Sequence, residues 1–211
     1  MISTFYAVGS LDALRVVLGE RCAAHSGQLD VVIVPSAASF TGAPEACVAI
    51  AELCNEFDVR VEALMVTDRT STNEPYFEQR IRAADLVILA NGSALHARLT
   101  WRNSLVGDAL KDAKVVAAIG SVASVVAEVM IDPRGGAPTT GLGLFDGVAF
   151  CEPASDEQLA RTRALIEPTM ALVVLGALAV VVHDETWRVV VDDVVVTRGQ
   201  TPSSLSLGDR H

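Results

Sequence analysis

Four short apolar runs, rich in valine and isoleucine, constrain the fold of this chain most strongly. They are spaced as in βαβ units, in which a helix carries the chain back to the same end of a parallel sheet. Runs that are almost continuously apolar suit strands covered on both faces. The four runs are Val31–Val34, Val61–Val66, Leu86–Leu89 and Val115–Ile119.

The segments between these runs carry helix signals. Pro44 and Glu45 open a predicted helix over Ala46–Glu56, and Asn73 to Pro75 cap a second one over Tyr76–Ala84. A third is predicted over Ala123–Met130. The alternation predicts an α/β fold, a doubly wound and mainly parallel sheet with helices on both faces.

The chain changes character after Asp132, where a glycine- and proline-bearing loop extends to Leu144. We expect antiparallel hairpins at the C-terminal edge of the sheet, since short valine-rich runs alternate there with polar turns. Residues 1–198 are predicted to form one domain, and 199–211 a flexible tail. The remaining predicted elements are strands at Val148–Cys151 and Ala171–Leu175, a helix over Asp156–Glu167, and hairpin strands at Val180–Val182, Trp187–Val191 and Val194–Thr197.

Composition excludes several classes of function. The net charge is −10, with 26 acidic and 16 basic residues and no basic cluster, which disfavours a nucleic acid or an anionic membrane as partner. The mean hydropathy is +0.40, but the longest apolar stretch, Met170–Val182, is too short to cross a bilayer. The N-terminus does not resemble a signal peptide, so we expect a cytoplasmic protein.

The cysteines and histidines show no metal-binding pattern. The four cysteines form no C-x-x-C pair and show no metal-like clustering with the four histidines; they are Cys22, Cys47, Cys54 and Cys151, beside His25, His96, His183 and His211. We expect free thiols, no metal and no cofactor.

The segment Val115–Val126 has the layout of a nucleophile elbow, a buried strand followed by Gly120, Ser121 and a helical run. In such an elbow a sharp turn holds the nucleophile, and nearby N–H groups stabilise an oxyanion. Ser121 is therefore the candidate nucleophile. Its neighbours Ile119 and Val122 are larger than the small residues that usually flank an elbow.

Two further segments should meet this turn, because ligands collect beyond the carboxyl ends of the strands in open α/β sheets. They are Pro35–Ala38 after the run Val31–Val34 and Ala90–Ser93 after the run Leu86–Leu89. Asn91, Gly92 and Ser93 thus join Gly120 as candidate pocket residues. Gly92 is either an oxyanion donor through its backbone N–H or a simple tight turn.

In their order and spacing, several of these fragments resemble the S51 peptidases, which include aspartyl dipeptidase and cyanophycinase. The resemblance implies a class I glutamine amidotransferase-like, flavodoxin-like three-layer sandwich and a Ser-His-Glu triad. It covers most of residues 1–198. The fragments are Val31–Ala37, Arg80–Asp85, Asn91–Ser93, the elbow, Met130–Ala137 and Gly141–Leu144.

The chain departs from this implied triad at each member. An ungapped register anchored on Asp132–Arg134 puts Gly120 at the nucleophile position, and shifts of one or two residues put Ser121 or Val122 there. The family's histidine would fall within Phe150–Ala154, which holds no histidine, although Glu152 could act as a weaker base. The acid would fall within Leu175–Leu178, which has no ionisable side chain. His96 is the histidine nearest the expected crevice and the candidate replacement base.

Arg134 and Gly135 complete the candidate pocket. A guanidinium beside exposed backbone N–H groups could bind a carboxylate bidentately, or it could tie the loop to Asp132 or Asp146. The expected ligand is a small peptide or an acidic small molecule. The apolar hairpins at the C-terminal edge additionally predict a homodimer.

Two main hypotheses of function follow. The first is an S51-like protein with a degenerate triad that binds a ligand or partner without catalysis. The second is an active serine hydrolase of dipeptidase or cyanophycinase type that uses Ser121 with a relocated base. A role in assembly through the terminal hairpins is a third hypothesis.

Overall fold

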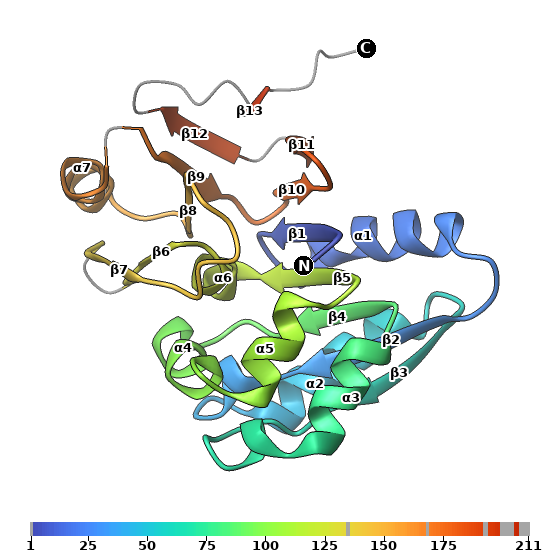
Figure 1. Ribbon diagram of the computed structural model, residues 1–211. Coiled ribbons are helices and arrows are strands. Elements are labelled where there is room, and N and C mark those ends of the chain that lie inside the picture. Colours follow the sequence, from blue (N-terminus) through green and yellow to red (C-terminus); the bar gives the residue numbers. More distant parts are fainter. Residues whose placement is uncertain (1, 134–135, 168, 192–193, 199–204, 207–211) are drawn as a thin grey trace.

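The computed structural model describes residues 2–133, 136–167, 169–191, 194–198 and 205–206. Its main feature is an eight-stranded sheet with the strand order β13-β11-β10-β1-β5-β4-β2-β3 (Figure 1). The strands are β1 (Thr4–Val8), β2 (Leu29–Val34), β3 (Val59–Ala63), β4 (Leu86–Leu89), β5 (Val115–Ile119), β10 (Val180–His183), β11 (Trp187–Val191) and β13 (Leu205–Ser206).

The parallel part of the sheet confirms the βαβ prediction. β1, β5, β4, β2 and β3 all pair in parallel, and β10 adds to the other edge of β1 in antiparallel orientation. β10 and β11 form the expected hairpin around His183–Thr186. The short strand β13, within the segment predicted to be a flexible tail, pairs in parallel with β11.

Helices cover both faces of this sheet, as predicted. On one face α1 (Leu11–Ala24) and α2 (Ala43–Cys54) pack on side chains such as Tyr6, Ile33 and Ile88. Four helices pack on the other face, against the strand residues that alternate with these and point the opposite way. They are α3 (Pro75–Ala83), α4 (Ala94–Trp101), α5 (Leu105–Lys111) and α6 (Ala123–Val126). Because successive side chains of a strand point to opposite faces, one continuous apolar run contributes to the hydrophobic cores on both sides of the sheet.

Local sequence sets where these helices begin. Serine hydroxyls at Ser10, Ser93 and Ser104 accept a hydrogen bond from the free N–H of the residue three positions later. Pro44 and Pro75 occupy the first turns of α2 and α3, where a missing N–H costs nothing.

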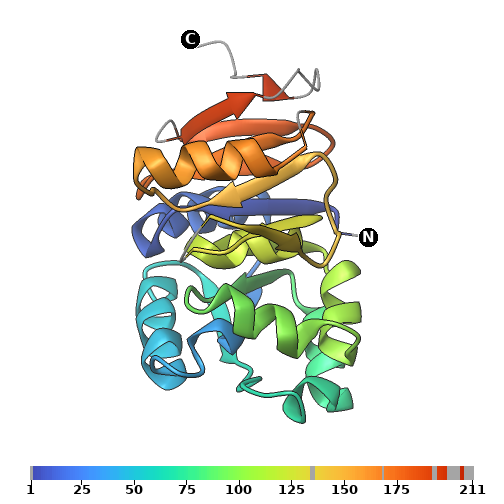
Figure 2. The same cartoon turned by 90° about the vertical axis from the view of Figure 1, so that its left-hand side faces the viewer.

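A second, three-stranded sheet lies beside the first, with the order β12-β9-β8. β8 (Val148–Cys151) and β9 (Ala171–Leu175) pair in parallel, and α7 (Asp156–Leu165) connects them. Figures 1 and 2 place α7 on the outer side of this sheet. β12 (Val194–Arg198) was expected to return along β11, but it pairs with β9 instead. The wholly buried β9 offers an apolar neighbour, whereas the outward side chains of β11 are partly exposed.

The predicted helix Ala123–Met130 is wrong in its length. α6 ends at Val126, and the chain continues as β6 (Val129–Ile131), which pairs with β7 (Pro138–Thr140) inside the expected loop. The backbone N–H groups of residues 141–144 donate to the carbonyl oxygens of residues 125–128 at 2.7–3.1 Å. A Cβ on Gly141 would lie 2.1 Å from the oxygen of Ala127. The Gly-Leu-Gly-Leu motif therefore terminates α6.

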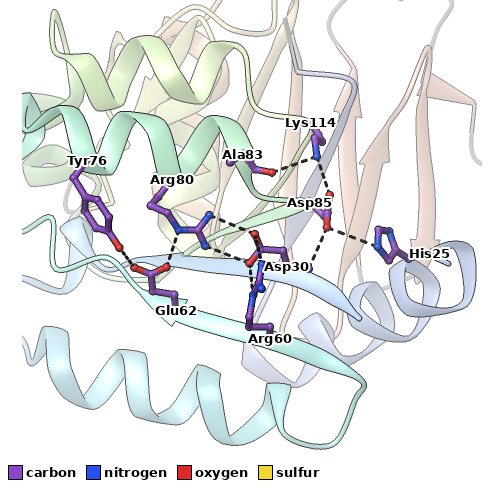
Figure 3. A network of polar contacts seen from close by, with 9 residues as sticks. All are labelled: His25, Asp30, Arg60, Glu62, Tyr76, Arg80, Ala83, Asp85 and Lys114. Carbon is purple, nitrogen blue, oxygen red and sulfur yellow. Dashed lines mark hydrogen bonds and ion pairs between the residues drawn. The ribbon is translucent and has the colours of Figure 1, made fainter. Parts of the chain in front are cut away.

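A polar network ties together the amino ends of the parallel strands (Figure 3). The Arg80 guanidinium, on α3, donates to Asp30 on β2 at 3.2 and 3.3 Å and to Glu62 on β3 at 2.7 Å. Tyr76 also donates to Glu62. Next to it, Lys114 bonds Asp85, which in turn accepts from the N–H of Asp30. The Arg80–Asp85 segment that contributed to the family resemblance is thus a structural tie between α3 and the sheet.

The network also lowers the pKa values of its carboxyl groups. Burial raises the pKa of Asp30, but hydrogen bonds from Arg60 and Arg80 outweigh burial and hold it below its usual range. The hydrogen bond from Tyr76, together with Arg80, holds the pKa of Glu62 below its ordinary value. Lowered carboxyl pKa values stabilise the fold above the ordinary carboxyl range, and this stability is lost as the pH falls.

We predict that Arg80→Met lowers the free energy of unfolding by about 1 to 2 kcal/mol near neutral pH, because it removes the cation that Asp30 and Glu62 share and leaves them only Arg60 and Tyr76 among the described residues. The difference from the wild type should shrink between about pH 5 and pH 3, where these carboxylates become protonated. Urea unfolding at several pH values measures both effects.

Arg15→Met is the matched control, because Arg15 pairs with Glu56 where both side chains are about half exposed (49% and 50%). It should leave stability almost unchanged. An Arg80 variant as stable as this control would contradict the structural role of the network.

Candidate functional site

Three loops meet at the carboxyl ends of β2, β4 and β5, as predicted. The N–H of Ser93 donates to the Ala37 oxygen at 2.7 Å, which joins the β2 and β4 loops. The hydroxyl of Ser121 lies 2.7 Å from the Gly92 oxygen, which joins the β4 and β5 loops. This edge lies opposite the polar network of Figure 3, which is built at the amino ends of the strands.

The turn after β5 has its strained backbone at Gly120. This residue has φ +59°, whereas Ile119 is extended and Val122 is helical. Ile119 and Val122 are buried on opposite faces of the sheet. In a nucleophile elbow the strained residue carries the nucleophile. In this chain the residue with that backbone geometry is Gly120, and Ser121 is the next residue of the short 3-10 helix Gly120–Val122.

The side chain of Asn91 fills the space above Gly120. A Cβ built on Gly120 would lie 2.4 Å from Asn91 Nδ2 and 2.6 Å from its Cγ. Strain and space therefore both favour glycine at position 120. A serine in this place would collide with the Asn91 amide.

The amide oxygen of Asn91 accepts hydrogen bonds from two backbone donors. The N–H of Gly92 lies 2.7 Å away and the N–H of Ser121 lies 3.2 Å away. In elbow hydrolases, the N–H of the residue after the nucleophile and one N–H from another loop form the oxyanion hole. Asn91 Oδ1 thus occupies the position that an oxyanion would take between these donors.

The orientation of this amide follows from its partners. Two N–H groups require an acceptor, so the oxygen must face them, and Nδ2 then points toward Glu152 Oε1 at 3.3 Å. Glu152 follows β8, within the segment where the resemblance implies the histidine of the triad.

The hydroxyl of Ser121 is engaged with oxygen acceptors. Its partners within the described residues are the Gly92 carbonyl at 2.7 Å and Asn91 Oδ1 at 3.0 Å, and its single proton serves one of them at a time. Neither partner is a base that could remove the proton. Ser121 is also largely buried.

His96 is held away from Ser121 by other contacts. Its Nε2 lies 2.9 Å from the Thr67 oxygen, and its ring packs edge-on against Phe40 with a centroid distance of 4.5 Å. Its own N–H is capped by Ser93 at the start of α4. The structure therefore brings the two candidate catalytic residues into neighbouring loops without a hydrogen bond between them.

The segment after β9, where the acid of the triad would fall, serves packing. A Cβ on Gly9 would lie 1.7 Å from the Gly176 oxygen, so residues 176–177 pass directly over the end of β1. The Gly9 N–H donates to the Ala179 oxygen at 2.9 Å. This close approach requires glycine at position 9. The segment Leu175–Leu178 itself contains no polar side chain.

A cavity of about 80 Å³ lies beside the turn, between the β5 and β8 loops and α7. Ser121, Ser124 and Glu152 line one side, and Gln158, Leu159 and Thr162 of α7 line the other. Cys151 also reaches it, but burial, with the nearby Glu152, raises the pKa of the thiol to about 11, so it stays protonated near neutral pH.

Arg134 and Gly135 lie outside the described residues. The loop on either side of them is anchored to α7, because Gln158 Nε2 donates to the Pro133 oxygen at 3.0 Å and Thr162 Oγ1 lies 2.8 Å from the Gly136 oxygen. Within the described part of the chain, no cluster of histidine, cysteine or acidic residues could hold a metal ion. No helix there is both long and apolar enough to cross a membrane.

Sequence reasoning identified the three loops but missed the role of the Asn91 side chain. The Asn-Gly pair was interpreted through its backbone alone, as a turn or an oxyanion donor. A carboxamide next to a strained glycine was the available signal, since asparagine readily bonds the backbone near its own position.

Comparison with known proteins supports the architecture. No family model and no curated protein matches the chain by sequence. The solved structure of a peptidase from an acI-B1 Actinobacterium aligns with a TM-score of 0.79 and 19% identity over 99% of this chain and 96% of that one. The chain therefore has the fold of this solved structure. A second structure of this fold, the "Putative Peptidase E Protein from Listeria monocytogenes EGD-e", aligns with a TM-score of 0.66 and 10% identity over 94% of this chain and 99% of that one.

The TM-scores show that the chain shares the fold of these two structures, and at such low identity they say nothing about its activity. The three-layer arrangement agrees with the architecture that the S51 resemblance implied. Both alignments span nearly the whole of each chain.

We predict that Gly120→Ala and Asn91→Ala are energetically coupled. Gly120→Ala alone should destabilise the protein by about 2 to 4 kcal/mol, because it adds backbone strain and a collision with the Asn91 amide. In the Asn91→Ala background the collision is gone, and the cost should fall by about 1 kcal/mol or more. Urea unfolding of the four proteins measures this coupling.

Gly147→Ala is the matched control, since Gly147 has φ +71° and open space around its Cβ position. It should show the cost of strain alone, about 1 to 2 kcal/mol, in both backgrounds. Equal costs for Gly120→Ala with and without Asn91 would refute the packing described above.

Proposed function

We propose that this chain is an S51-like protein with a degenerate triad, which binds a small ligand in the site of a peptidase fold without hydrolysing it. The observation that supports this most directly is the turn after β5. The residue with the left-handed backbone there is Gly120. The Asn91 amide fills the space that a side chain at position 120 would need, and its oxygen accepts from the two N–H groups that would otherwise bind an oxyanion.

The surrounding residues support the same proposal. A serine hydroxyl is a poor nucleophile at neutral pH without an adjacent base. Ser121 bonds a carbonyl and an amide oxygen, and His96 is engaged with Thr67 and Phe40. The carboxylate of Glu152 interacts with Asn91 rather than with Ser121.

The alternative is an active hydrolase that uses Ser121 with Glu152 or His96 as base. It would require the Ser121 hydroxyl to leave both of its present acceptors, and the Asn91 amide to leave the two backbone donors. The cavity beside Ser121 and Glu152 is the feature that favours this alternative.

A fluorophosphonate probe distinguishes the two readings, because it labels serine nucleophiles that are activated by a base. We expect no labelling of the wild-type chain above the level of the Ser121→Ala variant, with intact-mass spectrometry as the measurement. A trypsin-like serine hydrolase in the same reaction verifies the probe. Stoichiometric labelling that disappears in Ser121→Ala would overturn the proposal and establish the hydrolase.

A further inference from the structure

We infer that the cavity beside Ser121 and Glu152 binds a small primary ammonium group, with Glu152 as its counter-ion. The inference rests on the proposed function, a ligand site without a nucleophile, and it specifies the chemical class of the ligand. An ammonium group on a short apolar stem is the chemistry that the cavity fits, whether it belongs to a free amine or to a peptide amino terminus.

The backbone N–H groups of the turn that could bind an anion already donate to a side chain of the protein. The N–H groups of Gly92 and Ser121, which would hold an oxyanion or a carboxylate, both donate to Asn91 Oδ1. A carboxylate ligand would have to displace this internal acceptor, and it would then face the negative charge of Glu152, whose Oε1 lies 3.3 Å from the Nδ2 of the same amide.

The hydroxyl groups that line the cavity already donate their hydrogen bonds to oxygen atoms of the protein. Ser124 donates to the Ser121 oxygen at 2.7 Å, and Ser121 lies 2.7 Å from the Gly92 oxygen. Thr162 donates to the oxygen of Gly136 at 2.8 Å or of Gln158 at 3.0 Å. These hydroxyls can therefore offer a ligand their lone pairs rather than their protons.

The carboxylate of Glu152 adds the negative charge. Its hydrogen-bond partner is Asn91 Nδ2 at 3.3 Å, and none of the ion pairs within the described part of the chain includes it. A carboxylate has two oxygens that together can accept about four hydrogen bonds, so the described residues use only a small part of the capacity of Glu152.

The size and apolar lining of the cavity limit the rest of the ligand. A volume of about 80 Å³ holds a group of a few heavy atoms, and Ile131, Pro153 and Leu159 provide apolar contacts for a short stem. An ammonium group has three donors and no acceptor, which complements a cavity of acceptors with one negative charge.

The test is a titration of the uniformly 15N-labelled chain, followed by amide chemical shifts, near neutral pH and at constant ionic strength. The probes are n-propylammonium and propionate, which match in size and differ in charge, each up to about 50 mM. We expect n-propylammonium to shift the amides of Ser121, Ser124 and Glu152 saturably, and propionate to leave them unchanged.

Two variants assign the binding to the carboxylate. Glu152→Gln should weaken the binding of n-propylammonium about tenfold or more, because it removes the charge with little change in shape. Glu157→Gln is the matched control, since Glu157 is exposed on α7 and does not line the cavity. It should bind as the wild type does.

A second pair of probes distinguishes the source of the ammonium group. Alanyl-alanine amide has a free amino terminus, and its N-acetyl derivative lacks the charge. Tighter binding of the free peptide than of n-propylammonium identifies a peptide amino terminus, whereas binding of n-propylammonium alone identifies a free amine.

Three outcomes would overturn the inference: no saturable shift with any ammonium probe, a stronger response to propionate, or unchanged ammonium binding in Glu152→Gln. Each of these leaves the proposed function standing if the fluorophosphonate probe fails to label Ser121. Labelling of Ser121 overturns the proposed function whatever the amine titration shows, so the two failures are distinguishable.

Discussion

The hydrogen bonds to the amide oxygen of Asn91 determine what the site of this protein can do. This oxygen joins the loop after β4 to the turn after β5 by accepting from one N–H of each. Because the amide lies there, position 120 has no room for a side chain, and because Gly120 carries none, the amide can approach. The positions of Asn91 and Gly120 thus depend on each other, and together they place a neutral, internally hydrogen-bonded pair at the turn after β5.

The sequence was sufficient to predict the parallel sheet, the helices on both faces and the meeting of three loops. Val31–Val34 and Leu86–Leu89 are apolar throughout, which only a doubly covered strand explains. Long-range choices were harder. Val194–Thr197 has a pattern that suits β11 and β9 equally, and only the buried environment of β9 decides between them. α6 was predicted too long because its end depends on a loop that follows about fifteen residues later.

The meeting of the three loops could be predicted from the sequence, whereas the contacts of the Asn91 side chain could not, for a physical reason. Topology alone brings the carboxyl ends of parallel strands together. Which way an asparagine side chain turns depends on the donors that surround it, and these become visible only in three dimensions. Asn91 and Glu152 come from loops that are far apart in the chain, and no spacing rule relates them.

Several fragments that resemble the S51 peptidases prove to have structural roles. Gly141–Leu144 terminates α6 through its backbone, and Arg80–Asp85 binds α3 to the strands. Such fragments can persist wherever the architecture persists, which is what structural likeness at 19% and 10% identity reports. In this chain they therefore report on the architecture and not on catalysis.

The polar network of Figure 3 and the turn around Gly120 lie at opposite ends of the same strands. This arrangement separates the contacts that hold the strands together from the contacts around the candidate site. A substitution around Gly120 leaves the ties at the amino edge in place, so the strands can keep their register while the side chains at the carboxyl edge change.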